Sequence, residues 1–409
     1  MKQLLVLLAL AACGALHAEP DEALLGKEQG YPVGTLATLV QNASKVGAWS
    51  ALDRVSGVVV NRVQAPAQAR PLARVDAPPA IRYRYRNIGY SLDEYLERNR
   101  ATGLLILQDG RIVAERYRYA RKDDARFLSF SMAKSVTALL VGIAQQQGAI
   151  ASLDDTAETY AKELAGTPYG GTSIRHLLRM SSGLAFTERY DGTDDIARMS
   201  RAFFTGEGTA NVLRTIADRH SPAGEKFVYA SAETDVLGRV LRGATGRTLA
   251  ALTQEWLWQP MGAEHEAFWV VGRDGREGAH GFFNATLRDW ARLGWLLTKD
   301  GAVDGKQLVP REYLLDATDP QRQPPQFRPQ RATPFFGYGY QFWLLPQRER
   351  SFVMQGVYGQ GLYVQPASGI VMVLTSVWDG ASGRQDPRPY EERNALWRGV
   401  LQSLGGNTD

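Results

Sequence analysis

A serine and a lysine three residues apart, Ser131 and Lys134, have the types and spacing that nucleophilic catalysis requires. A serine nucleophile needs a base that takes its proton and donors that hold the oxyanion. Residues i and i+3 share one face of a helix, so these two side chains can touch. Near the buried start of a helix the free N–H groups are positive, and burial lowers the pKa of a lysine. The pair therefore predicts a serine nucleophile with a lysine as its proton partner.

The position of this pair carries more weight than its spacing, because a lone Ser-x-x-Lys motif arises easily by chance. Apolar residues from Met132 to Ile143 recur at helical spacing, and Gly148 suits a carboxyl-terminal cap. Apolar side chains surround this segment on most sides, so we expect a buried helix that opens at the serine. A Ser-His-Asp triad is not favoured, because the sequence lacks a Gly-x-Ser-x-Gly motif.

Strand signals lie at both ends of the chain and helix signals lie between them. Two apolar runs within 103–117 flank Asp109-Gly110, which is a strong hairpin signal. Further strands are expected at 338–345, 352–357, 361–364 and 370–376. We therefore predict an α/β protein of the α+β type: an antiparallel sheet formed by both chain ends, flanked by helices, with a helical subdomain inserted at about 150–320.

Composition narrows the classes of function. The 409 residues carry a formal net charge of +4, and the charges are scattered, whereas a nucleic-acid or anionic membrane surface needs clustered charge. Neither metal-ligand spacing nor a phosphate-binding loop is present, so we expect no metal and no other cofactor. Frequent Gly and Pro over 19–80 predict an extended amino-terminal arm, followed by one domain over 81–404 that begins with a helix capped by Ser91.

The first 18 residues are typical of an export signal. Lys2 precedes an unbroken apolar run from Leu4 to Ala12, which is too short to span a membrane. Cleavage after Ala18 predicts a periplasmic or secreted protein. The alternative is a lipoprotein box that would place a lipid anchor on Cys13, the single cysteine of the chain. Either way we expect neither a disulfide nor a transmembrane segment.

Several motifs together resemble the serine β-lactamase-related superfamily, which includes class C β-lactamases, DD-peptidases and related esterases. The resemblance covers about 85–400. Its motifs, in family order, are Ser131–Lys134, Ile174–Leu184, Tyr229–Ser231 with Thr234–Gly238, Thr286–Asp289 and Gly337–Tyr340. It implies a β-lactamase/transpeptidase-like fold over 81–404 and a covalent acyl-enzyme mechanism without a cofactor.

Within this superfamily the chain is most similar to the 6-aminohexanoate-dimer hydrolase and carboxylesterase branch. That likeness rests on Phe186–Tyr190, on Tyr-x-Ser in place of Tyr-x-Asn, and on Gly356–Gln360. It implies Ser131 as nucleophile, Lys134 as its proton partner and Tyr229 as general base and acid. Ser231, in place of the Asn, can donate one hydrogen bond. Tyr190 resembles a second tyrosine that touches the substrate.

The third motif departs from the β-lactamase pattern of Lys or His, a small residue and Gly. The sequence offers Met354-Gln355-Gly356, after which the N–H of Val357 would complete an oxyanion hole with that of Ser131. An alternative alignment uses Tyr358-Gly359-Gln360, so we include Gly356, Tyr358 and Gln360 among the candidate substrate-binding residues. Loss of the cation removes a partner for substrate carboxylates and favours an esterase or amidase.

Two alternatives remain open at this point. A β-lactamase or DD-peptidase is the alternative activity, acting like the esterase on a small-molecule substrate. A catalytically idle binding module is the alternative of another class. Retention of Ser131, Lys134 and Tyr229 together favours an active enzyme, because drift would be expected to erase at least one of them.

Overall fold

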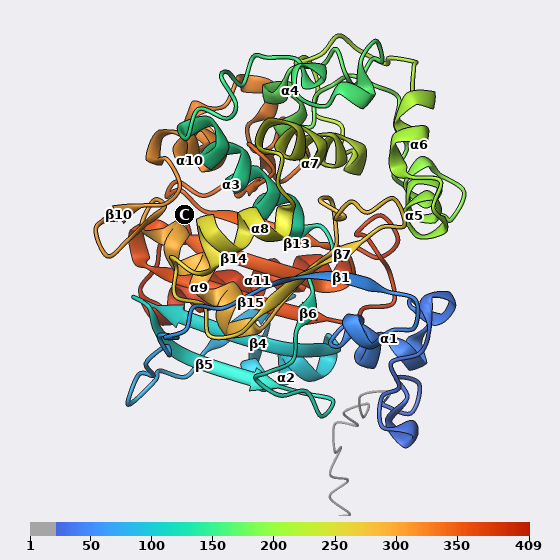
Figure 1. Cartoon of the computed structure of the whole chain (residues 1–409). Helices are drawn as coiled ribbons and strands as arrows, with labels where there is room; N and C mark the ends of the chain where they lie inside the picture. The colour runs from blue at the N-terminus through green and yellow to red at the C-terminus, as the bar shows by residue number, and fades with distance from the viewer. Residues whose placement is uncertain (1–21) are drawn as a thin grey trace, which may run out of the picture.

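The computed structural model describes residues 22–409, so the predicted signal segment and Cys13 lie outside the described residues. Its centre is a seven-stranded antiparallel sheet in the order β11-β12-β13-β14-β15-β4-β5 (Figure 1). In chain order these strands are β4 (Ala101–Gln108), β5 (Arg111–Tyr117), β11 (Gly337–Tyr338), β12 (Trp343–Leu344), β13 (Phe352–Gly356), β14 (Gln360–Gln365) and β15 (Ile370–Ser376). Pairing of β15 with β4 joins the two ends of the chain, which confirms the predicted sheet.

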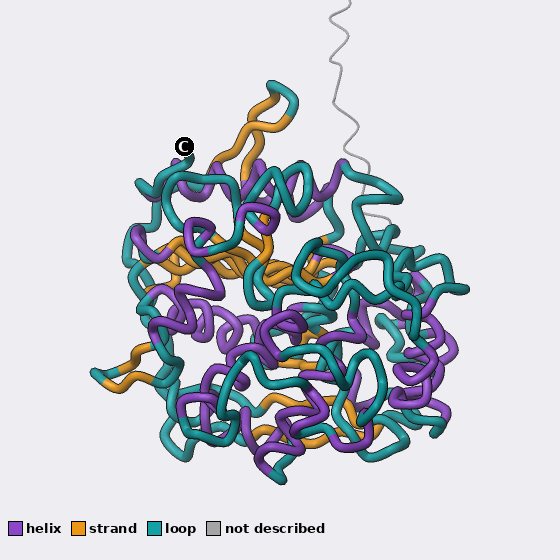
Figure 2. Tube along the Cα trace, turned by 90° about the horizontal axis from the view of Figure 1, so that it is seen from above, coloured by secondary structure: helices purple, strands orange, loops and turns teal. Residues whose placement is uncertain are grey.

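Apolar side chains along β4 point alternately to the two faces of this sheet, which explains why helices cover both faces. Leu105 and Leu107 belong to the core beneath α3 (Met132–Gln146) and α9 (Leu287–Thr298). Leu104 and Ile106 belong to the core beneath α2 (Leu92–Arg98) and α11 (Arg388–Leu404). Successive strand side chains point to opposite faces, so one apolar strand serves both cores. Seen from above, the strands lie between helices (Figure 2).

Local signals placed three elements correctly. The β4–β5 hairpin turns at Asp109-Gly110, where both residues have positive φ. Ser91 caps α2 by accepting a hydrogen bond from the Glu94 N–H, and the Glu94 carboxylate accepts one from the Ser91 N–H. The buried helix α3 begins directly after Ser131.

The stretch between α3 and β11 contains a helical subdomain, parts of a second sheet and a separate two-stranded sheet. The helices are α4 (Ile174–Leu178), α5 (Asp195–Thr205), α6 (Thr209–Thr215), α7 (Ser231–Thr245), α8 (Leu249–Thr253) and α10 (Arg311–Thr318). The strands are β7 (Ala267–Val271), β8 (Phe283–Ala285), β9 (Ala302–Val303) and β10 (Lys306–Gln307). β7 was not predicted because a short, fully apolar run cannot be distinguished from a buried helix by periodicity. β8, β9 and β10 are only two or three residues long, which is too short for a periodic signal.

The amino-terminal segment 22–80 lies against the domain and carries α1 (Asn42–Ala48) and β1 (Val59–Val63). β1 pairs with β7, and with β8 and β6 (Phe127–Leu128) they form the second sheet in the order β1-β7-β8-β6. A separate hairpin, β2 (Arg82–Tyr85) and β3 (Ile88–Ser91), packs on α11. Because β6 leads into α3, this second sheet links the amino-terminal segment to the start of the Ser131 helix.

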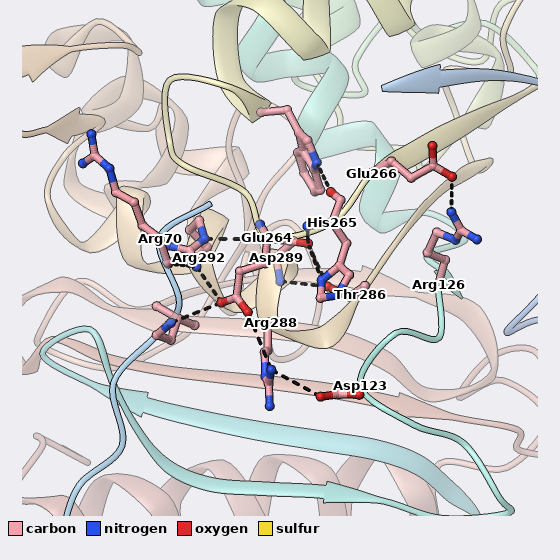
Figure 3. Close-up of polar contacts among 12 residues, drawn as sticks. Arg70, Asp123, Arg126, Glu264, His265, Glu266, Thr286, Arg288, Asp289 and Arg292 are labelled. Carbon is pink, nitrogen blue, oxygen red and sulfur yellow. Dashed lines mark hydrogen bonds and ion pairs between the residues drawn. The ribbon is translucent and has the colours of Figure 1, made fainter. Parts of the chain in front are cut away.

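A buried polar network anchors the Thr286–Asp289 motif at the start of α9 (Figure 3). Asp289 accepts hydrogen bonds from the N–H groups of Glu264 and His265, at 2.6 and 3.0 Å. Arg292 donates to the carbonyl of Arg70 and to the Glu264 carboxylate. The network therefore holds the amino-terminal segment on α9. None of the helices within 22–409 has the length and apolar character needed to cross a membrane.

Candidate active site

Ser131 and Lys134 meet at the start of α3, as the i, i+3 spacing predicts. The Lys134 Nζ donates to the Ser131 Oγ at 2.9 Å and to the His280 carbonyl at 2.5 Å. Lys134 is only 2% exposed, and burial lowers its pKa to about 8, while the charge of Glu188 acts in the opposite direction. A fraction of neutral amine close to the serine is therefore present near neutral pH.

Tyr229 lies just before α7 and faces the same serine. Its ring stacks on Trp343 with centroids 5.4 Å apart, and the Lys134 Nζ lies 5.2 Å from its centroid. Burial, followed by the charge of Glu188, raises the pKa of Tyr229 well above its ordinary value, while a hydrogen bond with Ser131 lowers it. The resting side chain is therefore a phenol and can donate a proton.

The third motif reaches the serine at the end of β13. A Cβ atom on Gly356 would lie 2.3 Å from the Ser129 carbonyl oxygen, so only glycine permits this approach. The next residue, Val357, borders the same cavities as Ser131. The alignment in which Gly356 precedes the oxyanion-hole residue therefore places Val357 beside the serine.

Tyr358 and Gln360, from the alternative alignment, occupy different places. Tyr358 has a left-handed backbone, φ 59°, and its side chain forms part of a cavity wall. Gln360 is 2% exposed, and its amide donates to the carbonyls of Val357, Tyr358 and Ser376 at 3.2, 3.3 and 2.8 Å. Gln360 thus stabilises the Val357–Gly359 turn through buried hydrogen bonds. It does not line either of the cavities at Ser131.

Glu188 is the central acid of the site, and the sequence analysis gave it no role. Its carboxylate accepts hydrogen bonds from the Tyr190 hydroxyl at 2.6 Å, the Ser231 hydroxyl at 2.8 Å and the Ser231 N–H at 2.6 Å. Tyr190 and Ser231 thus meet through this carboxylate. The motif Phe186–Tyr190 contained the signal, because Glu188 lies two residues before Tyr190, a candidate substrate-binding residue, in the same loop.

Two cavities meet at Ser131 and share Glu188, Tyr190 and Val357 in their walls. The larger, of about 420 Å³, is mainly apolar and includes Leu39, Val40, Phe130, Phe204, Phe282 and Tyr358. The smaller, of about 230 Å³, includes Tyr229, Phe336, Trp343, Gln355, Arg384 and Tyr390. A third, of about 590 Å³, lies beside Arg70 and Trp295 and has a different lining. A substrate could therefore extend on both sides of the serine.

Arg384 is a cation of the smaller cavity that the sequence analysis did not consider. It lies on an exposed turn held by hydrogen bonds from the Tyr390 hydroxyl to the Ala381 carbonyl and from the Ala381 N–H to the Gln385 side chain. Within residues 22–409 no hydrogen bond or ion pair of Arg384 is found. No cluster of potential metal ligands occurs in the same range.

Comparison with known proteins shows the family of this chain. The profile of the Beta-lactamase family matches residues 92–396. The chain belongs to the Beta-lactamase family. A 6-aminohexanoate-dimer hydrolase from Paenarthrobacter ureafaciens is 27% identical over 331 residues, which cover 78% of this chain and 81% of that protein. This member of the Beta-lactamase family is therefore a serine hydrolase, which confirms the prediction of an enzyme.

Solved structures show the same fold. A Bacillus anthracis protein provisionally named a 6-aminohexanoate-dimer hydrolase superposes with a TM-score of 0.79 at 23% identity, covering 90% of this chain and 96% of that one. A penicillin-binding protein homologue from Pyrococcus abyssi gives 0.61 at 18% identity, covering 77% and 76%. EstCE1, a hydrolase with promiscuous acyltransferase activity, gives 0.57 at 18% identity, covering 75% and 96%. The predicted β-lactamase/transpeptidase-like fold is confirmed.

Replacement of Gly356 by alanine tests the close approach of β13 to the serine segment. The new methyl group would overlap the Ser129 carbonyl and move Val357 away from Ser131. We expect Gly356→Ala to lower kcat by about 10² or more, the usual effect of losing one oxyanion-hole donor. Steady-state kinetics checks this, with Gly89→Ala as the control, because Gly89 is also a strand glycine without positive φ but a Cβ atom there would have no neighbour within 4 Å. Unchanged kcat in Gly356→Ala would contradict the close packing.

Proposed function

We propose that this serine hydrolase cleaves an ester or amide through an acyl-enzyme on Ser131. The observation that carries the proposal is the buried Lys134 amine, 2.9 Å from the Ser131 hydroxyl where two cavities meet. Lys134 and Tyr229 are the acid–base groups, and the N–H groups of Ser131 and Val357 hold the oxyanion. This arrangement supplies the base and the oxyanion donors that a serine nucleophile needs.

Acylation uses Lys134 as a neutral amine and Tyr229 as a neutral phenol. Neutral Lys134 takes the proton of Ser131 as the Oγ attacks the substrate carbonyl, which leaves an ammonium and a tetrahedral oxyanion. Collapse of this intermediate breaks the bond to the leaving group. The phenol of Tyr229 protonates the departing alkoxide or amine, and the Lys134 ammonium returns a proton to the phenolate.

Deacylation runs the same transfers in reverse. Water attacks the ester of Ser131 and loses a proton through Tyr229 to Lys134. The second tetrahedral intermediate expels the Ser131 alkoxide, which regains its proton from the Lys134 ammonium. The products are a carboxylic acid and an alcohol or amine, and the enzyme returns to its starting state.

The cavity walls favour small acyl or neutral substrates. The wall of the larger cavity is mainly apolar, although Glu188, Asp194, Arg201, five hydroxyl groups and one imidazole also border it. Position 354 of the third motif carries no cation. The similarity to a 6-aminohexanoate-dimer hydrolase supports activity on amides. Arg384 favours one alternative, a β-lactamase or DD-peptidase activity, because a guanidinium pairs well with a substrate carboxylate.

We also propose that the protein is exported. The support is the sequence of residues 1–18, which combines Lys2, the apolar run and the Ala18 site. Lipid attachment at Cys13 is the alternative. The mass of the mature amino-terminal peptide distinguishes the two, because cleavage after Ala18 leaves Glu19 first whereas lipoprotein processing leaves a lipidated Cys13.

Covalent labelling tests the nucleophile directly. We expect a fluorophosphonate to form one adduct at Ser131, found by intact mass and peptide mapping. Lys134→Ala and Tyr229→Phe should each lower kcat by about 10² or more, the usual scale of acid–base help, without unfolding the protein. An adduct on another serine, or no adduct, would contradict the mechanism and favour an idle binding module.

The pH profile tests the Lys134 assignment. Because the amine must be neutral to accept a proton, kcat/KM should rise with pH through about 8, the lowered pKa of Lys134. The charge of Glu188 raises this pKa, so Glu188→Gln should move the limb to lower pH. Rates measured from pH 5 to 10 provide the check, and a limb that moves upward in Glu188→Gln would refute the assignment.

A comparison of substrates tests the neutral-substrate preference. We expect short-chain nitrophenyl esters to be cleaved far faster than nitrocefin, because neither Met354 nor Tyr358 supplies a cation. The comparison is of kcat/KM for both substrates on one preparation. If nitrocefin equals or exceeds the esters and Arg384→Ala removes only the nitrocefin activity, then the alternative activity is correct.

A further inference from the structure

The amino-terminal segment contacts both sides of the proposed oxyanion hole. The buried indole of Trp49 packs edge-on against Phe130, with centroids 4.9 Å apart, and lies 4.9 Å from the ring of Tyr358. Phe130 immediately precedes Ser131, and Tyr358 immediately follows Val357. The Phe130 and Tyr358 rings are themselves 5.4 Å apart. Trp49, from the arm, thus contacts the residue next to each of the two proposed oxyanion donors.

Lys45, one turn earlier on α1, holds the same loop with a buried cation. Its Nζ donates to the Trp378 carbonyl at 3.0 Å and lies 4.9 Å from the Tyr358 centroid and 5.6 Å from that of Trp49. The residue is 3% exposed, and burial lowers its pKa to about 8. A buried ammonium needs compensating partners, and here a carbonyl and two aromatic faces provide them.

Phe130 and Tyr358, the two residues that Trp49 contacts, have backbone conformations that neighbouring residues must stabilise. Phe130 has φ 45° and Tyr358 has φ 59°, in the left-handed region, which is strained for bulky residues. Tyr358 is also fixed by its N–H bond to the Ala381 carbonyl at 3.1 Å and by the Trp378 N–H bond to its own carbonyl at 3.2 Å. Surrounding structure must therefore maintain the conformations that aim the Ser131 and Val357 N–H groups.

Two further hydrogen bonds of Trp49 fix this part of the arm, one to the domain and one within the arm. The Trp49 carbonyl accepts the N–H of Leu128, which leads to the serine, at 2.7 Å. The Trp49 indole N–H donates to the Leu39 carbonyl at 2.8 Å, and Leu39 and Val40 form part of the larger cavity wall. The family profile begins at residue 92, so this contact comes from outside the matched region.

We propose that Lys45 and Trp49 are positioning residues that hold the Ser131 and Val357 N–H groups in the geometry that binds the oxyanion. This inference rests on the proposed function, because it assigns the arm to the same oxyanion hole. Oxyanion contacts form fully only in the tetrahedral state, so a misplaced donor lowers kcat while substrate binding changes little. A displacement of about 1 Å can cost about 10²-fold in rate.

The experiment compares Lys45→Met with the parent protein. Methionine fills the space of the aliphatic chain without the charge, and Trp49→Phe provides a second variant that keeps a smaller ring. Lys299→Met controls for loss of a lysine–tryptophan contact, because the exposed Lys299 has its Nζ 4.3 Å from the Trp295 centroid in another region. Leu401→Ala, in the α11 core, controls for general destabilisation. Each is measured for kcat and KM on one nitrophenyl ester, inhibition by phenylboronic acid, and thermal unfolding.

We expect Lys45→Met and Trp49→Phe to lower kcat at least tenfold with KM within about twofold. Affinity for phenylboronic acid, which forms a tetrahedral adduct on the serine, should fall in parallel. The control variants should keep the parental kcat even where the unfolding temperature drops. If Lys45→Met does not fold, Trp49→Phe decides by the same criteria.

Two results would overturn the inference. The first is parental kcat in the folded arm variants, and the second is a rise in KM alone, which would make the arm only a wall of the cavity. Fluorophosphonate labelling of the parent protein distinguishes failure of the positioning role from failure of the proposed function. Labelling at Ser131 with unaffected arm variants removes the positioning role alone, whereas an unlabelled Ser131 removes the proposed function itself.

Discussion

A lysine amine buried beside a serine hydroxyl is the constraint on which the rest of this site depends. Water would hold Lys134 as an ammonium, whereas the protein interior penalises that charge and lowers the pKa to about 8. The cost of burial is offset by the Ser131 hydroxyl and the His280 carbonyl. Helix α3 must therefore begin in the interior, between the second sheet and the helical subdomain.

Glu188 balances the charge of this buried centre. Its charge favours the ammonium of Lys134, and it adds to the effect of burial, which is the main reason why the Tyr229 phenol stays protonated at rest. It also fixes Tyr190 and Ser231 through three hydrogen bonds. One carboxylate thus influences the ionisation of two side chains, Lys134 and Tyr229, and the orientation of two others, Tyr190 and Ser231. Such shared partners explain why removal of single residues from a network has effects that do not add.

The serine lies where elements from four parts of the chain converge. Helix α3 supplies Ser131 and Lys134, the segment before α7 supplies Tyr229, the end of β13 supplies Val357, and the arm supplies part of the larger cavity wall. The approach of β13 is so close that position 356 has no room for a side chain. Under the proposed function, substrate selection depends on two unequal cavities, one mainly apolar and one bordered by Arg384.

The sequence by itself determined the local parts of this protein. The i, i+3 spacing of Ser131 and Lys134, the Asp109-Gly110 turn and the cap at Ser91 act over a few residues, so pattern and propensity were sufficient to predict them. The motifs also identified Tyr229 and Val357 as candidates. Only the tertiary structure decided what surrounds them. Lys45 and Trp378 are 333 residues apart, and Glu188 and Ser231 are 43 apart. Contacts over such separations depend on how helices and sheets pack, and side-chain spacing along one chain does not encode them.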